Sequence, residues 1–143
     1  MKVVVDTNVL VAGLLSPFGP PGEIVRMIAS GALQVCFDAR ILTEYEDVLA
    51  RPKFQFSREH TRLLLEQIRT EGLSVAGVPL PVRLPDRTDE PFLEAALAGQ
   101  VFCLITGNIK HFPPARRQGM VVLSPGEFLD SLRKRARPRT RKG

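Results

Sequence analysis

Apolar residues along the chain form either short continuous runs or stretches with helical spacing. The short runs predict five strands, at residues 2–5, 33–37, 73–78, 101–106 and 120–123. The stretches with apolar residues three and four positions apart predict six helices, at residues 8–15, 23–29, 39–50, 58–70, 91–98 and 125–132. Strands separated by helices are typical of an α/β domain with a mainly parallel sheet and right-handed crossovers.

Proline, glycine and serine predict where these elements begin and end. The segment 16–22 contains three prolines and two glycines, and we expect a loop there that no helix crosses. Ser57 and Ser124 each precede a predicted helix and are candidate N-caps, and Pro125 is suited to the first helical position. The proline-rich segment 79–85 predicts a link without regular structure.

Length and composition favour one globular domain. The chain has 143 residues, of which 44% are hydrophobic and 24% are charged. Asp6 interrupts the first apolar run, which is too short for a secretory signal or a membrane span, so we expect a cytoplasmic protein without a membrane anchor. Cys36 and Cys103 lie in apolar runs and are expected to be buried free thiols. Two cysteines and two histidines at unrelated spacings predict no zinc site.

The net charge of +5 comes from the end of the chain. Residues 133–143 contain seven bases and no acid, and the other 13 bases and 15 acids give residues 1–132 a formal charge of about −2. We therefore expect a slightly acidic domain over residues 1–132 and a basic, disordered tail over residues 133–143. Such a tail can attract phosphate groups or simply keep the protein soluble.

Polar residues gather where predicted strands end. Asp6, Thr7 and Asn8 follow the first strand, residues 106–108 follow the fourth, and residues 86–90 precede the helix that leads to the fourth. Since the carboxyl ends of parallel strands form one edge of a sheet, we expect these groups to lie close together. Glu44 adds a carboxylate near the apolar face of the helix at 39–50.

Carboxylates that converge raise each other's proton affinity, and a divalent cation relieves the repulsion between them. Mg²⁺ and Mn²⁺ accept carboxylate oxygens, retain water ligands and can activate one of these waters for attack on a phosphodiester. The residues therefore predict a metal site made of acids rather than histidines or thiols. Each acid also has a purely structural explanation, because Asp6 and Asp89 could cap helices and Glu44 could be a solvated helix residue.

Four segments together resemble the PIN-domain family in their order and spacing. They read VVVDTNVLVAGLLSPFGPPG, DARILTEYEDVLARPKF, DRTDEPFLEAALAGQVFCLITGNIKHFP and VVLSPGEFL. The similarity is greatest to a bacterial and archaeal branch of predicted toxins of toxin–antitoxin pairs that is related to the VapC toxins, and it covers residues 1–132. It implies a PIN-like three-layer α/β/α fold with a central sheet of four to five strands. It also implies cleavage of single-stranded RNA with Mg²⁺ or Mn²⁺, homodimers, and for toxin members a cognate antitoxin.

Carried over position by position, the resemblance makes Asp6, Glu44 and Asp89 the catalytic and metal-binding acids. Glu90 and Asp86 are weaker candidates for the third acid. Asn8 and Thr106 match supporting polar positions. Family members generally have a further aspartate where this chain has Asn108, an amide that keeps an oxygen ligand but lacks the negative charge. We therefore expect one firmly bound cation rather than a tight pair.

Arginines and lysines near the acids are candidates for holding RNA. Arg40, Arg51 and Lys53 flank the helix that carries Glu44, and Arg58, Arg62 and Arg69 lie on the next helix; they could line a phosphate track or be solvated surface groups. The helices at 23–29 and 58–70 could supply a dimer face.

The main alternative to an enzyme is a PIN-like domain that has lost activity and binds RNA or protein, which Asn108 favours. An aspartate-based phosphatase fits poorly because Asn8 stands where that chemistry needs a second acid. A mononucleotide-binding domain also fits poorly, because no glycine-rich phosphate loop follows the first strand.

Overall fold

A five-stranded parallel sheet forms the centre of the structure, a computed structural model that describes residues 1–136. The strands are β1 (Lys2–Val5), β2 (Gln34–Phe37), β3 (Leu73–Ser74), β4 (Cys103–Ile105) and β5 (Val122–Leu123). They lie in the order β3-β2-β1-β4-β5, and every neighbouring pair is parallel. The predicted α/β architecture is confirmed.

Helices connect the strands. The α-helices are α1 (Thr7–Leu15), α2 (Pro20–Ala29), α3 (Ala39–Leu49), α4 (Arg58–Glu71), α5 (Glu90–Gly99) and α6 (Pro125–Ala136). Single 3₁₀ turns are η1 (Pro52–Phe54), η2 (Arg87–Asp89), η3 (Ile109–His111) and η4 (Pro114–Arg116). Ser57 caps α4 as expected, because its side chain accepts the N–H of His60.

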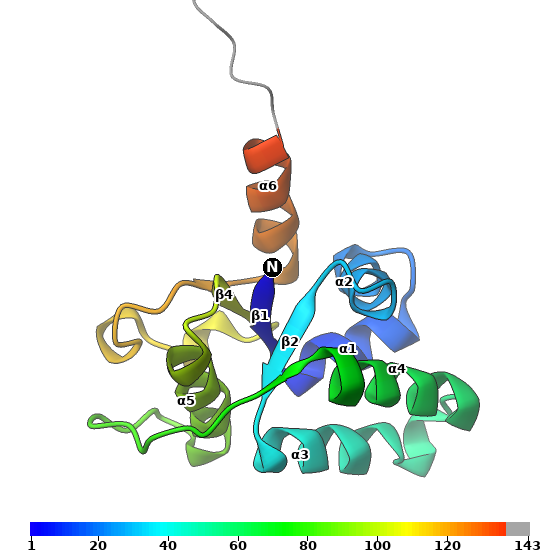
Figure 1. The fold of residues 1–143 in the computed structure, drawn as a ribbon, viewed down its shortest axis with the longest axis horizontal. Coiled ribbons are helices and arrows are strands. Elements are labelled where there is room, and N and C mark those ends of the chain that lie inside the picture. Colours follow the sequence, from blue (N-terminus) through cyan, green and yellow to red (C-terminus); the bar gives the residue numbers. More distant parts are fainter. Residues whose placement is uncertain (137–143) are drawn as a thin grey trace, which may run out of the picture.

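The helices lie on both faces of the sheet. In Figure 1, α5 lies on one side of β1 and β2, and α1, α2 and α4 lie on the other. Helix α3 lies across the end of the sheet toward which β1 and β2 run, and it contacts α1, α4 and α5. Because both faces are covered, β1 and β4 are built from apolar side chains that are fully buried from Val3 to Val5 and from Cys103 to Ile105.

Two predicted boundaries are wrong for identifiable reasons. Helix α2 begins at Pro20 rather than at residue 23, because proline is tolerated in the first turn of a helix, where its missing N–H has no partner to lose. Strand β3 ends at Ser74 rather than at residue 78. Ser74 pairs with Phe37, the last residue of β2, and the residue after Phe37, Asp38, already caps α3. An edge strand cannot continue beyond the strand that it pairs with.

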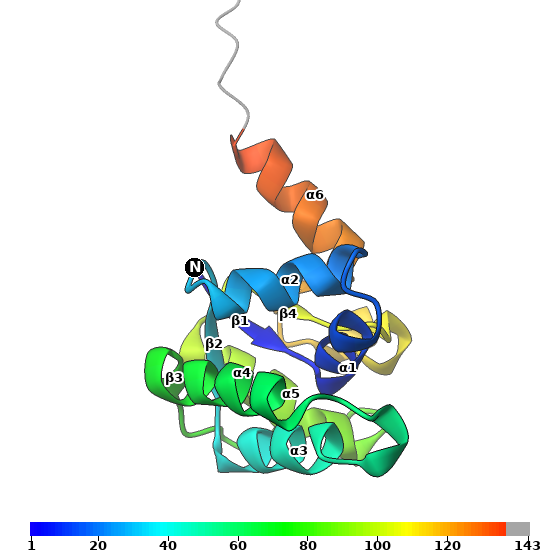
Figure 2. The ribbon, with the colours of Figure 1, turned by 90° about the vertical axis from the view of Figure 1, so that its right-hand side faces the viewer.

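The last predicted helix is also longer than expected, because α6 continues to Ala136 instead of ending at residue 132. Ser124 and Glu127 form reciprocal hydrogen bonds of 2.9 and 3.1 Å between side chain and backbone, which fix its first turn. Arg133, Lys134 and Arg135 lie in its last turn, where positive charge is favourable. The helix projects from the sheet (Figure 2). The rest of the predicted tail, residues 137–143, lies outside the described residues.

Cys36 and Cys103 are buried free thiols, as predicted. Burial raises the pKa of Cys103 to about 12 and so keeps this thiol protonated. Among residues 1–136, no helix combines the length and the apolar character needed to cross a bilayer.

Candidate functional site

Asp6 and Thr106 follow two neighbouring strands at the point where each strand ends. Val5 pairs with Ile105 in the parallel register of β1 and β4, so the following residues enter the same edge of the sheet. The hydroxyl of Thr106 donates to Asp6 Oδ2 over 2.9 Å, and the N–H of Asp6 donates to the carbonyl of Ile105 over 2.9 Å. Asp6 is 5% exposed and Thr106 fully buried. The carboxylate is therefore fixed at the edge where open parallel sheets bind ligands.

Asn8 connects this carboxylate to the loop after β4. Its amide donates to Asp6 Oδ2 over 3.3 Å, and its carbonyl oxygen accepts the N–H of Gly107 over 3.0 Å. A side chain at Gly107 would press on Asn8, since a Cβ there would lie 3.3 Å from Oδ1. The backbone N–H of Asn108 donates to the Thr106 hydroxyl over 3.0 Å, whereas the exposed Asn108 side chain makes no hydrogen bond within residues 1–136. Asn8 and Thr106 are placed to support Asp6, and Asn108 as a ligand stays a prediction.

Glu44 reaches the same edge from α3. The hydroxyl of Thr7, the residue after Asp6, donates to Glu44 Oε2. Helix α3 is anchored there because the buried Tyr45 donates its hydroxyl to the carbonyl of Val5, the last residue of β1. Glu44 is half-buried rather than a freely solvated helix residue.

Asp89 stands at the junction of η2 and α5 and is 8% exposed. His111 Nδ1 lies 3.0 Å from Asp89 Oδ2 and forms an ion pair with it when the imidazole is protonated. The contact is outside hydrogen-bond geometry, so with His111 neutral this buried oxygen has no hydrogen-bond donor within residues 1–136. A buried carboxylate oxygen without a donor is costly unless a cation compensates it. Asp89 also makes no capping hydrogen bond to α5.

The three acids act on each other through their charges. Burial raises the pKa of Asp6 to about 6, the hydrogen bond from Thr106 opposes this, and the negative charges of Asp89 and Glu44 raise it further. Burial likewise raises the pKa of Asp89, against the lowering effect of His111, and the negative charges of Asp86 and, to a smaller extent, Glu44 add to the rise. The acids that are distant in the sequence therefore share one electrostatic site.

The acids do not form a closed ligand cage, and the expected tight convergence is corrected in this respect. Within residues 1–136, no group of three or more acids, histidines or cysteines is close enough together to hold a metal ion. The donors still fit Mg²⁺ or Mn²⁺, which commonly bind through one or two carboxylates and retain several waters. The donor-free oxygen of Asp89 and the raised pKa of Asp6 are the two features that such a cation would relieve.

Asp86 and Glu90, the weaker candidates for the third acid, are engaged elsewhere. Asp86 is exposed and caps η2, because it accepts the N–H and the hydroxyl of Thr88 over 2.9 and 2.7 Å; these bonds lower its pKa. Glu90 accepts Arg83 Nη1 over 3.1 Å and the N–H of Leu84 over 3.0 Å. It therefore holds the proline-rich link against α5, and of these three acids only Asp89 is among the charges that raise the pKa of Asp6.

A second acidic cluster, which the sequence analysis missed, surrounds Arg40. This side chain donates to Asp38 Oδ2 over 3.0 and 2.6 Å and to Glu94 Oε1 over 2.8 Å. Asp38 also caps α3 by accepting the N–H of Ile41 over 3.0 Å. Asp38 follows β2 directly, as Asp6 follows β1, and that position was the available indication. Because two carboxylates engage Arg40, we leave it out of the RNA-binding surface proposed below.

A shallow groove of about 480 Å³ runs beside Glu44. Thr7 and Asn8 line one side of it, and Arg51 and Phe54 line another. Arg51 is exposed and forms only a loose surface pair with Asp47, whose Oδ2 lies 3.4 Å from Nη2. The exposed Lys53 lies with Nζ 5.0 Å from the centre of the Phe54 ring. Unlike Arg40, Arg51 lines this groove with only a loose acidic partner, whereas Lys53 contacts Phe54 but does not itself line the groove.

Comparison with known proteins agrees with this arrangement. A family model described as a PIN domain matches residues 2–110, which include Asp6, Glu44, Asp89 and Asn108. The match ends before the C-terminal part of the resemblance noted above, which extends to residue 132. No curated protein matches the chain. Since the family match covers most of the sequence and the parallel sheet and its acidic edge are those expected of the fold, the chain belongs to the PIN-domain family.

Proposed function

We propose that this PIN domain is a Mg²⁺- or Mn²⁺-dependent endoribonuclease that cleaves single-stranded RNA at the edge formed by Asp6, Glu44 and Asp89. PIN domains have a nuclease-type fold and typically use divalent metal ions. The observation that carries the proposal is the electrostatic interaction of Asp6 with Glu44 and Asp89. The pKa of Asp6 is raised, and Asp89 has a buried oxygen without a hydrogen-bond donor in the described residues.

The chain's own residues would position and charge the site. Thr106 and Asn8 hold Oδ2 of Asp6, Thr7 holds Oε2 of Glu44, and Asp89 is fixed by the turn that precedes α5. The carboxylates of Asp6, Glu44 and Asp89 would hold a divalent cation, which would supply activation of a water and neutralisation of phosphate charge. In the overall hydrolysis the water oxygen bonds to phosphorus, the bond to the 3′ oxygen breaks, and that oxygen takes a proton. The products are a 5′-phosphate and a 3′-hydroxyl.

Cleavage of an end-labelled, unstructured RNA tests the proposal. We expect cleavage with Mn²⁺, none with EDTA, and a large loss in Asp6→Asn. Cleavage that persists in EDTA and in Asp6→Asn would come from a contaminant and would remove the case for catalysis.

One observation favours a second candidate, a domain that binds RNA or protein without cleaving it. Asn108 supplies no charge, and its exposed side chain makes no hydrogen bond within the described part of the chain. The same assay decides between the two, because a binding module retains RNA in the presence of Mn²⁺ without shortening it.

The cellular setting is proposed on family resemblance. We place the protein in the cytoplasm, as a homodimer and as the toxin of a toxin–antitoxin pair. A small open reading frame beside the gene, whose product rescues cells from expression of this chain, supports that role. Harmless expression of an active nuclease contradicts it.

A further inference from the structure

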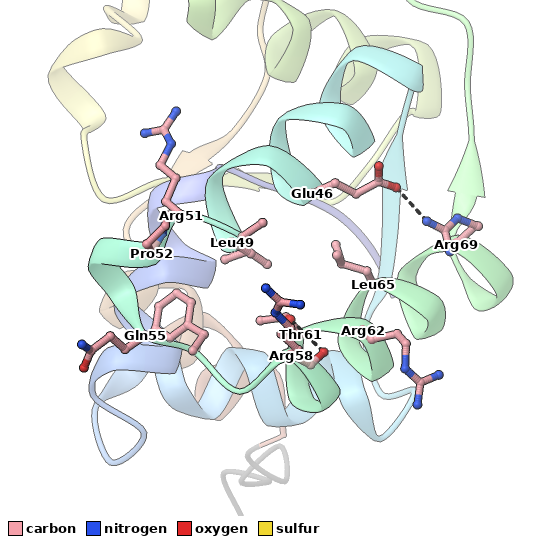
Figure 3. Close-up of a pocket in the computed structure, with 12 residues that line it drawn as sticks. Glu46, Leu49, Arg51, Pro52, Gln55, Arg58, Thr61, Arg62, Leu65 and Arg69 are labelled. Atoms are coloured by element: carbon pink, nitrogen blue, oxygen red, sulfur yellow. Dashed lines mark hydrogen bonds and ion pairs between the residues drawn. The ribbon is translucent and has the colours of Figure 1, made fainter.

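A basic pocket lies between α3, η1 and α4 (Figure 3). Its lining does not include Asp6, Glu44 or Asp89. Its volume is about 510 Å³, within the range of pockets that bind small organic groups. Leu49, Leu65 and Phe56 provide an apolar lining. Its cationic lining, which we call the arginine set, consists of Arg51, Arg58, Arg62 and Arg69.

Two members of the arginine set have no carboxylate partner. Arg69 pairs with Glu46 over 2.7 Å at one side of the pocket (Figure 3), and Arg51 has its loose pair with Asp47. Arg58 and Arg62 are exposed, and their guanidinium groups form no ion pair or hydrogen bond within residues 1–136. Glu46 is the only acid that lines the described pocket. The pocket therefore carries a net positive charge in a domain that is otherwise slightly acidic.

The basic pocket adjoins the groove beside Glu44. Arg51 lines both the pocket and that groove. Phe54 lines the groove, Phe56 lines the pocket, and their rings stack with centroids 5.2 Å apart and planes 10° apart. A chain molecule that lies along the groove would thus pass one arginine and an aromatic pair before it enters the pocket.

We propose that this pocket binds a nucleotide of the RNA strand outside the cleaved bond, with Arg58 and Arg62 at its phosphates and the apolar lining against its base or ribose. The inference rests on the proposed function and names how the same substrate is held. Single-stranded nucleic acids are bound by such combinations of cationic and apolar or aromatic groups. An acidic protein segment would also match the positive charge of the pocket. RNA is favoured because Arg51 lines both the pocket and the groove beside Glu44.

Fluorescence anisotropy with a labelled oligouridylate of about twelve nucleotides tests the proposal, with EDTA present to prevent cleavage. For single strands, each phosphate contact contributes about 0.7 to the slope of log K against log salt. In the double variant Arg58→Ala/Arg62→Ala we therefore expect the magnitude of this slope to fall by about 1.4. Over the tenfold range from 1 M to 0.1 M salt, this difference makes Kd of the variant at 0.1 M about 25-fold higher than Kd of the wild type. At about 1 M salt the variant and the wild type should bind alike.

Matched variants separate the pocket from general electrostatics. Arg58→Lys/Arg62→Lys keeps both charges and should retain most of the affinity. Arg133→Ala/Lys134→Ala removes the same charge from α6, which lies at the far end of the domain from α3, and should leave Kd unchanged (Figures 1 and 2). Unfolding temperatures of all variants are measured to confirm that they fold.

Several outcomes overturn the inference. One is an unchanged Kd in Arg58→Ala/Arg62→Ala, and another is an equal loss in the α6 variant. A third is an oligoglutamate that binds the pocket while the RNA does not, which would assign it to a protein partner. The inference and the proposed function also fail separately. RNA that binds through the pocket but is never cleaved contradicts only the nuclease, and cleavage with an unchanged KM in the pocket variant contradicts only the pocket.

Discussion

The hydroxyl of Thr106 joins the end of β4 to the carboxylate of Asp6, because its Oγ1 donates to Oδ2 over 2.9 Å while accepting the N–H of Asn108 over 3.0 Å. Valine has a similar volume but no hydroxyl. In Thr106→Val, Asp6 Oδ2 would keep only the longer bond from Asn8, and the N–H of Asn108 would lose its partner. We expect the free energy of unfolding in urea to fall by about 1–2 kcal/mol, and RNA cleavage to fall by roughly tenfold or more.

Thr106→Ser is the matched control for this change. Serine restores the hydroxyl and removes only a methyl group, so cleavage should return close to the wild-type rate. If Thr106→Val cleaves as fast as the wild type, the hydrogen bond to Asp6 does not position the acid for the reaction.

Asp6 should make the metal-free fold less stable at neutral pH. Its pKa of about 6 in the folded state lies above the ordinary aspartate value of 3.8, so folding disfavours the ionised form. Stability is therefore expected to fall as pH rises from about 4 to about 6, and to stay reduced by up to about 3 kcal/mol above that range. Asp6→Asn removes this cost, so the variant should be more stable than the wild type at pH 7 and nearly equal to it below pH 4.

Urea unfolding in EDTA at several pH values measures this difference. Addition of Mg²⁺ or Mn²⁺ at neutral pH should then stabilise the wild type and leave Asp6→Asn almost unchanged, since a ligand stabilises only the state that binds it. Equal stabilisation of both proteins by the metal would place the cation away from Asp6.

The sequence was sufficient to predict the sheet and the location of the site because both depend on local patterns. Apolar runs identified β1 and β4, and the rule that parallel strands end at one edge placed Asp6 beside Thr106. The same rule did not say which acid near α5 faces the site. Asp86 and Glu90 are excluded only by bonds to Thr88 and to the link at Arg83 and Leu84, which are contacts of the folded chain.

Other features could not be predicted because they depend on side chains brought together from distant segments. The pairing of Arg40 with Glu94 crosses 54 positions of the sequence, and it changes an apparent RNA ligand into part of a structural cluster. The basic pocket likewise needs α3 and α4 to pack side by side before its arginines share one cavity. The separation of the three acids, which share an electrostatic site without forming a cage, is a matter of geometry that spacing does not encode.

Replacement of Asn108 by aspartate tests how many cations the site holds. The wild-type acids Asp6, Glu44 and Asp89 carry three negative charges, which suffices for one divalent ion, and Asn108→Asp adds a fourth at the exposed end of the loop after β4. We expect calorimetry to show one firm Mn²⁺ site in the wild type. In the variant we expect a second Mn²⁺ to bind more tightly than any second Mn²⁺ binds to the wild type. Two sites of similar affinity in the wild type would contradict the one-cation interpretation.

Arg40 and Arg51 lie near the two ends of α3, and we expect their replacement to have opposite consequences. Arg40→Ala leaves Asp38 and Glu94, which are about nine-tenths buried, without their cation, whereas Arg51→Ala removes only a loose pair with the exposed Asp47. Since the Arg40 side chain is itself half exposed, we expect Arg40→Ala to lose about 2 kcal/mol of unfolding free energy, less than for a fully buried pair. For Arg51→Ala we expect a loss of under about 0.5 kcal/mol.

Binding of the labelled oligouridylate should show the reverse order, with Arg51→Ala several-fold weaker and folded Arg40→Ala unchanged. Weaker RNA binding by Arg40→Ala under conditions where it is fully folded would return Arg40 to the RNA-binding surface.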